Sequence, residues 1–192
     1  MAYLTEAEVQ ARATQVISLQ NETAQQILME AVASAEEKFD VFLSHSSAES
    51  DIILLGVKAL LEDFNLKVYV DKYSDPQLSP EDVTRETAEI LRSRMRSSKT
   101  LIYIHSHHSQ KSRWMPWELG FFDGLNGKVG VLPVTRNQEE TFKNEEYLNL
   151  YPYVDFVPMN GKMQPQFWIN KTVELYAQLD SWVKGKEQIR KH

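Results

Sequence analysis

Cysteine is absent from the 192 residues of this sequence. Its absence excludes disulfide bonds and thiolate metal sites, and it favours an intracellular compartment. Long apolar runs are missing too, because none approaches the roughly 18–20 residues that a membrane span requires. The N-terminus lacks the basic start and apolar core of a secretory signal. We therefore expect a cytoplasmic protein that does not bind a membrane.

Positive charge is scarce as well, with 21 Lys and Arg against 27 Asp and Glu and a net charge of −6. This balance argues against a nucleic-acid partner, because phosphate contacts need clustered Lys and Arg. The basic run over residues 85–99 is typical of a helix face in water. No Gly-rich phosphate loop and no Ser-His-Asp order stand out, so the kinase and hydrolase classes that use them have no support.

The composition that remains, 42% hydrophobic and 25% charged, is that of an ordinary globular protein with one core. Its first segment, from Thr5 to about Glu37, predicts helix. Thr5 and Glu8 have the spacing of a capping box, in which the hydroxyl and the carboxylate satisfy backbone donors reciprocally.

A thin, Ala-rich stripe with polar interruptions follows at three- and four-residue steps, made of Val9, Ala13, Val16, Gln20, Ala24, Ile27 and Ala31. Residues 21–23 can cap a second helix, so one long helix and a helical hairpin both remain open. We expect Val16, Ile27 and Val32 to be buried, either by the main domain or by another copy of the chain.

After residue 37 short β-branched and aromatic runs alternate with helical periodicity. The predicted strands are residues 39–44, 66–71, 100–104, 129–134 and 153–157. The predicted helices are residues 50–64, a helix that begins at Ser79 or Pro80, residues 117–125 and residues 167–183. This alternation implies right-handed crossovers and a doubly wound, flavodoxin-like α/β fold with a five-stranded parallel sheet.

In such sheets the ligand site lies at the carboxyl ends of the strands, where the strand order reverses. The chain segments that leave this edge are residues 44–47, 71–79, 105–113 and 135–137. They are the candidate binding surface.

Three ordered motifs carry a family resemblance. Residues 38–46, KFDVFLSHS, and residues 67–71, KVYVD, resemble the first two strands of the TIR (Toll/interleukin receptor) family. Residues 109–120, SQKSRWMPWELG, are similar to the Ser-x-Trp-x-x-x-Glu-Leu segment of that family. The resemblance covers about residues 38–134, although the loop after the second strand lacks the usual Gly. It implies a helical extension over residues 1–37 and a TIR-like domain over residues 38–192.

TIR domains are either association modules or enzymes that cleave the nicotinamide–ribose bond of NAD⁺. Glu118 matches the catalytic residue of the enzymes. A carboxylate suits this chemistry, because departure of neutral nicotinamide leaves a ribosyl oxocarbenium that a negative charge stabilises. The resemblance therefore implies NAD⁺ as the substrate, with no other cofactor and no metal. For a stand-alone bacterial TIR protein it also implies a nucleotide signal in antiphage defence.

The substrate-binding residues that we expect are Ser44, His45, Ser46, Asp71, Tyr73 and Trp114. Trp114 precedes Glu118 by one helical turn, provided that Pro116 occupies the first turn of the helix. Turn capping explains the strand-end residues equally well, and Trp114 can be a core aromatic residue.

Two further functions remain open. The first is a catalytically inactive TIR module that recruits another TIR or an effector protein, or that associates with itself, through the long loop and the extension. The second is a nucleoside-transferring enzyme of related fold. Incubating the protein with NAD⁺ and resolving the products separates the enzyme from the association module.

Overall fold

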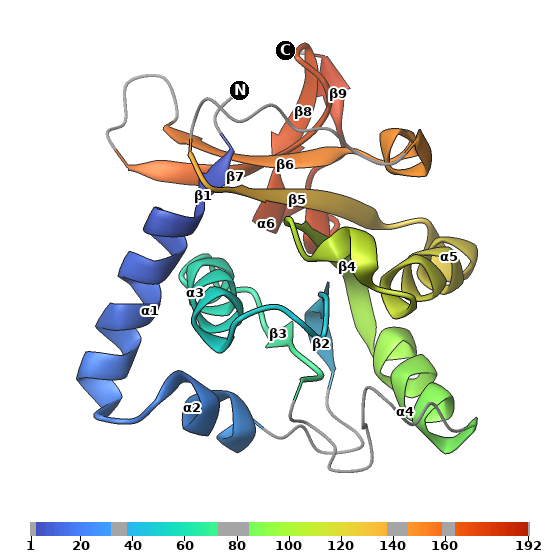
Figure 1. Ribbon diagram of the computed structural model, residues 1–192. Coiled ribbons are helices and arrows are strands. Elements are labelled where there is room, and N and C mark those ends of the chain that lie inside the picture. Colours follow the sequence, from blue (N-terminus) through green and yellow to red (C-terminus); the bar gives the residue numbers. More distant parts are fainter. Residues whose placement is uncertain (1–2, 32–37, 73–84, 138–145, 159–163, 192) are drawn as a thin grey trace.

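The computed structural model describes residues 3–31, 38–72, 85–137, 146–158 and 164–191. Its centre is a parallel sheet of five strands in the spatial order β3-β2-β4-β5-β6 (Figure 1). These strands are β2 (Phe39–Ser44), β3 (Val68–Tyr69), β4 (Ser98–His105), β5 (Val129–Thr135) and β6 (Tyr153–Pro158). The predicted five-stranded parallel sheet is therefore confirmed.

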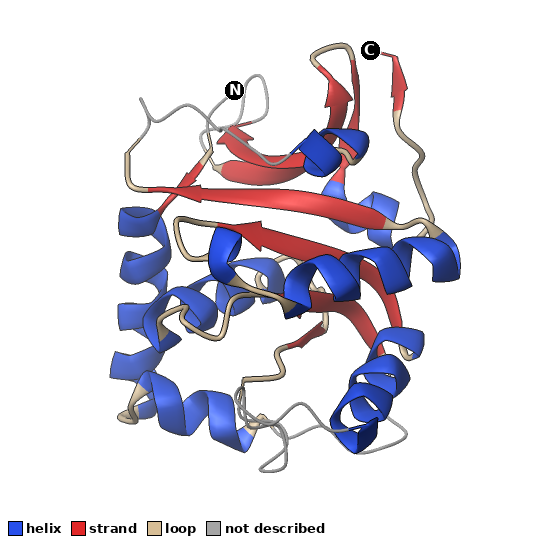
Figure 2. Cartoon of the chain, turned by 45° about the vertical axis from the view of Figure 1, so that its right-hand side comes forward, coloured by secondary structure: helices blue, strands red, loops and turns tan. Residues whose placement is uncertain are grey.

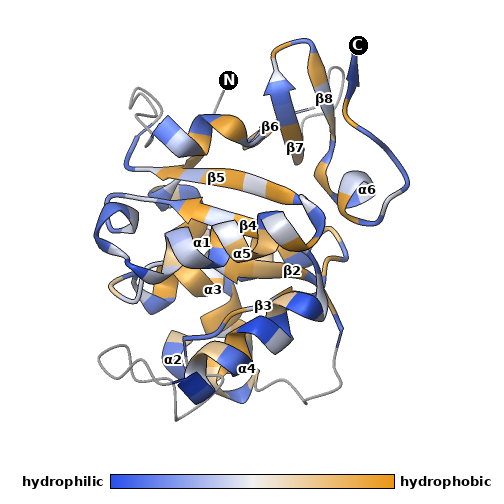
Figure 3. Ribbon diagram, turned by 90° about the vertical axis from the view of Figure 1, so that its right-hand side faces the viewer, coloured by the Kyte–Doolittle hydropathy of each residue, from blue (hydrophilic) through white to orange (hydrophobic). Residues whose placement is uncertain are grey.

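Helices cover both faces of this sheet (Figures 1 and 2). One face carries α1 (Glu6–Gln20), α2 (Ala24–Glu30) and α3 (Asp51–Glu62), and the other carries α4 (Arg85–Arg96) and α5 (Trp114–Asn126). Side chains of a strand alternate between the two faces. Val41 and Leu43 thus join the core beneath α1 and α3, whereas Phe42 joins the core beneath α4 and α5. Figure 3 shows the hydrophobic residues gathered on the central strands between these layers.

The N-terminal segment forms two helices, which settles the alternative that the sequence left open. Thr5 and Glu8 make the predicted capping box at the start of α1. Asn21 ends that helix in the left-handed conformation with φ of 58°. Thr23 and Gln26 then make a second capping box at the start of α2.

The two N-terminal helices pack on α3 and share its core. Buried apolar side chains from the segment are Leu4, Val9, Ala13, Ala24 and Leu28. The backbones approach so closely that a Cβ built on Gly56 would lie 2.2 Å from the carbonyl oxygen of Val9. Val16 and Ile27 are half-buried rather than buried, and Val32 lies outside the described residues.

The strand β1 (Leu4–Thr5) precedes these helices and pairs in parallel with the carboxyl end of β5, with Leu4 opposite Val134. The start of the chain therefore reaches the same edge of the sheet as the ends of the central strands. Within the part of the chain that the structure describes, no helix is long and apolar enough to cross a membrane.

The prediction of a helix over residues 167–183 is wrong. The chain forms antiparallel strands there, β7 (Pro165–Thr172), β8 (Leu175–Gln178) and later β9 (Arg190–Lys191), and only α6 (Leu179–Val183) is helical. Phe167 and Ile169 are buried and the Trp168 between them is half-buried, which is the two-residue period of a strand. Pairing of β7 with β6 prevails over the helical spacing of the later apolar residues.

Other boundaries differ by a few residues. The strand predicted over residues 66–71 is paired only at β3, and α5 begins three residues before the predicted helix. Short 3₁₀ turns lie at Ser109–Lys111 and Glu146–Leu150. The predicted helix start at Ser79 or Pro80 lies outside the described residues.

Candidate active site

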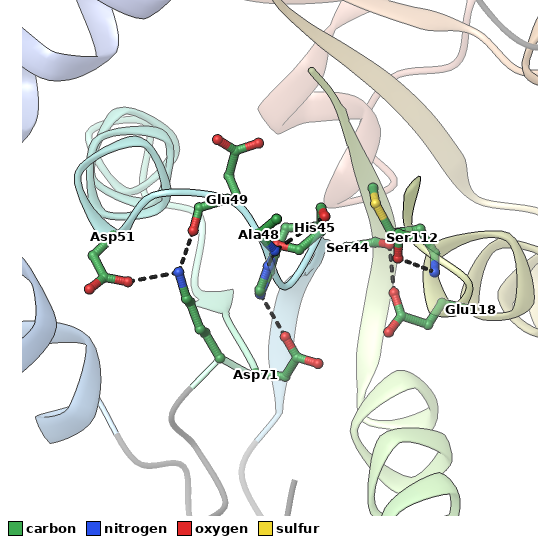
Figure 4. Close-up of polar contacts among 11 residues, drawn as sticks. Ser44, His45, Ala48, Glu49, Asp51, Asp71, Ser112 and Glu118 are labelled. Carbon is green, nitrogen blue, oxygen red and sulfur yellow. Dashed lines mark hydrogen bonds and ion pairs between the residues drawn. The ribbon is translucent and has the colours of Figure 1, made fainter. Parts of the chain in front are cut away.

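The carboxyl end of β2 meets the first half of α5. Ser44 is the last residue of β2, and its hydroxyl donates a hydrogen bond of 2.6 Å to Oε2 of Glu118 (Figure 4). Both side chains are buried, with 1% of Ser44 and 3% of Glu118 exposed. A carboxyl group is thus held inside the protein at the edge where the fold class places its ligands.

Local sequence explains why Glu118 faces inward. Pro116 lies in the first turn of α5, where an intrahelical N–H donor is not needed. The hydroxyl of Ser112 accepts the N–H of Met115 at 3.2 Å and fixes the start of the helix. Met115, Leu119 and Phe122 recur at the helical period and are buried against the sheet, and Glu118 is buried on the same side.

Burial dominates the electrostatics of Glu118. It raises the pKa of the carboxyl group to about 8, and the negative charge of Asp71 acts in the same direction. The hydrogen bond from Ser44 and the nearby His45 oppose this rise. Glu118 therefore holds a proton at neutral pH in the free protein, and a cation placed beside it would favour the ionised form.

His45 lies between two oxygen acceptors. Its Nδ1 donates to the carbonyl oxygen of Ser46 at 3.0 Å, and its Nε2 lies 2.7 Å from Oδ1 of Asp71. Burial lowers the pKa of His45, but Asp71, the Ser46 carbonyl and Glu118 together outweigh burial and raise it above its ordinary value. Because both ring nitrogens face acceptors, the protonated imidazolium is favoured.

The other predicted binding residues lie in different settings. Ser46 is buried and its hydroxyl accepts the N–H of Ala48 at 3.3 Å, as expected of a turn cap. Trp114 opens α5 and is half-buried, with its ring 5.2 Å from that of Trp117. The structure thus brings Ser44, His45, Asp71 and Glu118 together. Contact of Trp114 with a substrate stays a prediction, and Tyr73 lies outside the described residues.

Sequence reasoning missed a set of charged residues beside this group. The side chain of Glu49 is buried, with 4% of the residue exposed, and its carboxylate accepts a hydrogen bond from Ser106, the first residue after β4. Lys72 forms an ion pair of 2.9 Å with Asp51 in the first turn of α3. Asp51 was predicted as part of the helix start at Ser50. No motif or periodicity in the sequence distinguished Glu49 or Lys72 from ordinary surface residues.

A parallel sheet with a glutamate at the carboxyl ends of its strands is the architecture that the sequence motifs had suggested, whereas the burial of Glu118 was not predicted. The TIR domain family matches residues 41–165, and the chain belongs to this family.

Several relatives have names that state a reaction. The chain is 39% identical over 168 residues to ThsB′ of Bacillus cereus (strain MSX-D12), a probable 3′ cyclic ADP-D-ribose synthase, and the match covers 86% of each chain. It is 32% identical over 84 residues to TIR2 of Cytobacillus dafuensis, a putative cyclic ADP-D-ribose synthase, covering 43% of this chain and 22% of that protein. It is 29% identical over 109 residues to TcpB of Brucella abortus (strain 2308), a probable 2′ cyclic ADP-D-ribose synthase, covering 54% and 40%.

Proposed function

We propose that this TIR protein is an enzyme that cleaves the nicotinamide–ribose bond of NAD⁺ and closes the remaining ADP-ribose into a cyclic product. The observation that carries the proposal is the buried Glu118 carboxyl group bound by Ser44 at the carboxyl edge of the sheet. The names of the three relatives support the same reaction class. Those names differ on the hydroxyl that closes the ring, so the proposal covers cyclisation and leaves the isomer open.

The reaction needs one negative group beside the ribose. Nicotinamide leaves as a neutral molecule with the electron pair of the broken carbon–nitrogen bond, and the ribose becomes an oxocarbenium. The carboxylate of Glu118 stabilises that cation. A hydroxyl group of the same molecule attacks the anomeric carbon, and its proton passes to Glu118 and then to water. Attack by water in place of the hydroxyl gives linear ADP-ribose.

The charge of the substrate fits the resting state of the site. Free Glu118 holds a proton because its pKa is raised to about 8. The nicotinamide ring of NAD⁺ is a cation, and a cation within about 4–6 Å favours an ionised carboxylate. Binding of NAD⁺ therefore promotes the ionised form of Glu118 that the reaction uses. Without NAD⁺ the carboxyl group keeps its proton, and the site holds no buried negative charge on Glu118.

The remaining assignments belong to the same proposal. Ser44 orients Glu118, and the residues that bind the substrate are Ser44, His45, Ser46, Asp71, Tyr73 and Trp114. NAD⁺ is substrate and partner, the enzyme works in the cytoplasm, and its product serves as a signal in antiphage defence. Residues 1–37 form a helical extension of the TIR domain, which spans residues 38–192, and copies of the chain associate with one another.

An association module would have no use for a buried carboxyl group that holds its proton, since burying such a group without function destabilises a fold.

The test is to incubate the pure protein with NAD⁺ over a range of protein concentrations and to resolve nicotinamide, linear ADP-ribose and cyclic products. The range matters because TIR domains commonly self-associate. Absence of nicotinamide release at every concentration would favour the association module.

A further inference from the structure

Lys72 follows Asp71 directly, and its side chain contacts the loop between β2 and α3 and the first turn of α3. Its Nζ lies 2.9 Å from Oδ1 of Asp51 and also donates a hydrogen bond to the carbonyl oxygen of Glu49. The Lys72 side chain is 18% exposed and that of Asp51 25%. A lysine held by two oxygen acceptors in a partly buried place differs from the mobile lysines of a protein surface.

The carbonyl group that receives Lys72 is itself fixed. The Glu49 side chain is buried, and its Oε2 accepts from the hydroxyl of Ser106 while its Oε1 accepts the N–H of Ser50 at 3.3 Å. Ser106 in turn accepts the N–H of His108 at 3.2 Å. Glu49 therefore joins the loops that follow β2 and β4, and a buried carboxylate with these partners resists displacement.

Two adjacent residues are thus each held by a different partner. Asp71 contacts His45, and Lys72 contacts Asp51 and Glu49. Since consecutive Cα atoms are about 3.8 Å apart, fixing the side chain of one residue limits the movement of the other. His45 follows Ser44, whose hydroxyl binds Glu118. A shift of Asp71 would therefore change the charge beside the carboxyl group on which the proposed reaction depends.

We propose that Lys72 is a positioning residue of the candidate NAD⁺ site, where it holds Asp71 against His45 by binding Asp51 and the Glu49 carbonyl group. The inference rests on the proposed function for its effect on turnover. The position of His45 can be measured without turnover. Lys72 acts through Asp71 and need not touch the substrate.

The test compares Lys72→Met with Lys72→Arg and with a control, Lys58→Met. Lys58 forms an ion pair with Glu62 within α3, away from the site. The titratable groups that face His45 are Asp71 and Glu118, and the Ser46 carbonyl faces its Nδ1. Nuclear magnetic resonance titration of the imidazole, assigned with a His45→Gln sample, reports whether Asp71 still lies beside it.

In Lys72→Met we expect the pKa of His45 to fall by about one unit, because an opposite charge at contact distance raises it by that order. Turnover of NAD⁺ should fall by about tenfold to a hundredfold, as misplacement by about 1 Å commonly does. Lys72→Arg should restore both quantities in large part, and Lys58→Met should change neither. Asp51→Asn weakens the same contact from the other side and serves if Lys72→Met does not fold.

The outcomes separate this inference from the proposed function. An unchanged His45 titration in folded Lys72→Met or Asp51→Asn overturns the positioning role. A changed pKa of His45 with unchanged turnover of NAD⁺ would show that the position of Asp71 does not matter for the reaction. If the wild type releases no nicotinamide, the proposed function fails, and the titration alone then decides whether Lys72 holds Asp71.

Discussion

Replacing Glu118 by glutamine removes a titrating carboxyl group and keeps its shape and an oxygen acceptor for Ser44. Removal of one group that stabilises a transition-state charge commonly lowers the rate by about 10²–10³. The same substitution also changes stability. A carboxyl pKa raised from 4.5 to about 8 corresponds to roughly 5 kcal/mol of penalty against the ionised form in the folded protein. The activity and the stability of Glu118→Gln should therefore move in opposite directions at high pH.

The sign follows from proton binding. Between pH 4.5 and about 8 the folded protein keeps the Glu118 proton, whereas the unfolded chain has lost it. Stability of the wild type therefore falls as the pH rises through this window, and the full penalty is present above about pH 8. Glutamine has no such titration. We expect Glu118→Gln to match the wild type near pH 4 and to exceed its free energy of unfolding by several kcal/mol at pH 9.

The assay is urea unfolding at both pH values together with chromatography of NAD⁺ and its products, in conditions where the wild type is active. Glu86→Gln, the same change at an exposed position on α4, is the control and should alter neither quantity. A stability difference that does not depend on pH would show that Glu118 is ionised in the folded protein. Equal cleavage by the wild type and Glu118→Gln would show that Glu118 is structural.

The other predictions concern titration, packing and the N-terminal segment. The kcat/KM for NAD⁺ should rise with pH and level off above about 8, as ionisation of Glu118 requires, and a flat profile from pH 6 to 9 would contradict this. Gly56→Ala should lower the free energy of unfolding by about 1–3 kcal/mol, because the new methyl group meets the Val9 carbonyl, as denaturant unfolding would measure. Its control, Gly124→Ala, has open space around it and should stabilise α5 by up to about 1 kcal/mol. A chain that begins at Lys38 should expose the apolar faces beneath α1 and α2 and melt at a lower temperature or aggregate; unchanged melting and sedimentation would refute this.

The central strands were predictable because each is a short β-branched and aromatic run between polar turns. Val41, Ile102 and Val131 belong to such runs, and the alternation with helices determined that the strands are parallel. The meeting of Ser44 and Glu118 followed from the same rule, since the end of β2 and the start of α5 leave one edge of the sheet. The capping box at Thr5 needed only local spacing, and the cap that residues 21–23 offered for a second helix is made by Thr23.

The features that the sequence did not predict depend on contacts between distant segments. Residues 167–183 contain apolar side chains at both two-residue and four-residue spacing, and the pairing of Val154 with Ile169 decided for the strand. No local pattern contains that pairing. The ion pair of Lys72 with Asp51 was hidden for a similar reason, because it depends on the reach of a long side chain across two loops. The spacing of apolar residues in the sequence predicts helices and strands, whereas contacts between distant segments form only when those helices and strands have packed.

The pairing of β1 with β5 has a consequence for synthesis. Leu4 meets Val134, about 130 residues further along the chain, so the first strand has no partner until β5 has left the ribosome. At about 5–20 residues per second this interval is on the order of ten seconds. During that time Leu4 has no neighbouring strand, and bringing the two segments together closes a long loop. Leu4 and Thr5 are therefore fixed in the sheet only after β5 has been made, and Leu4 stays without its strand partner until then.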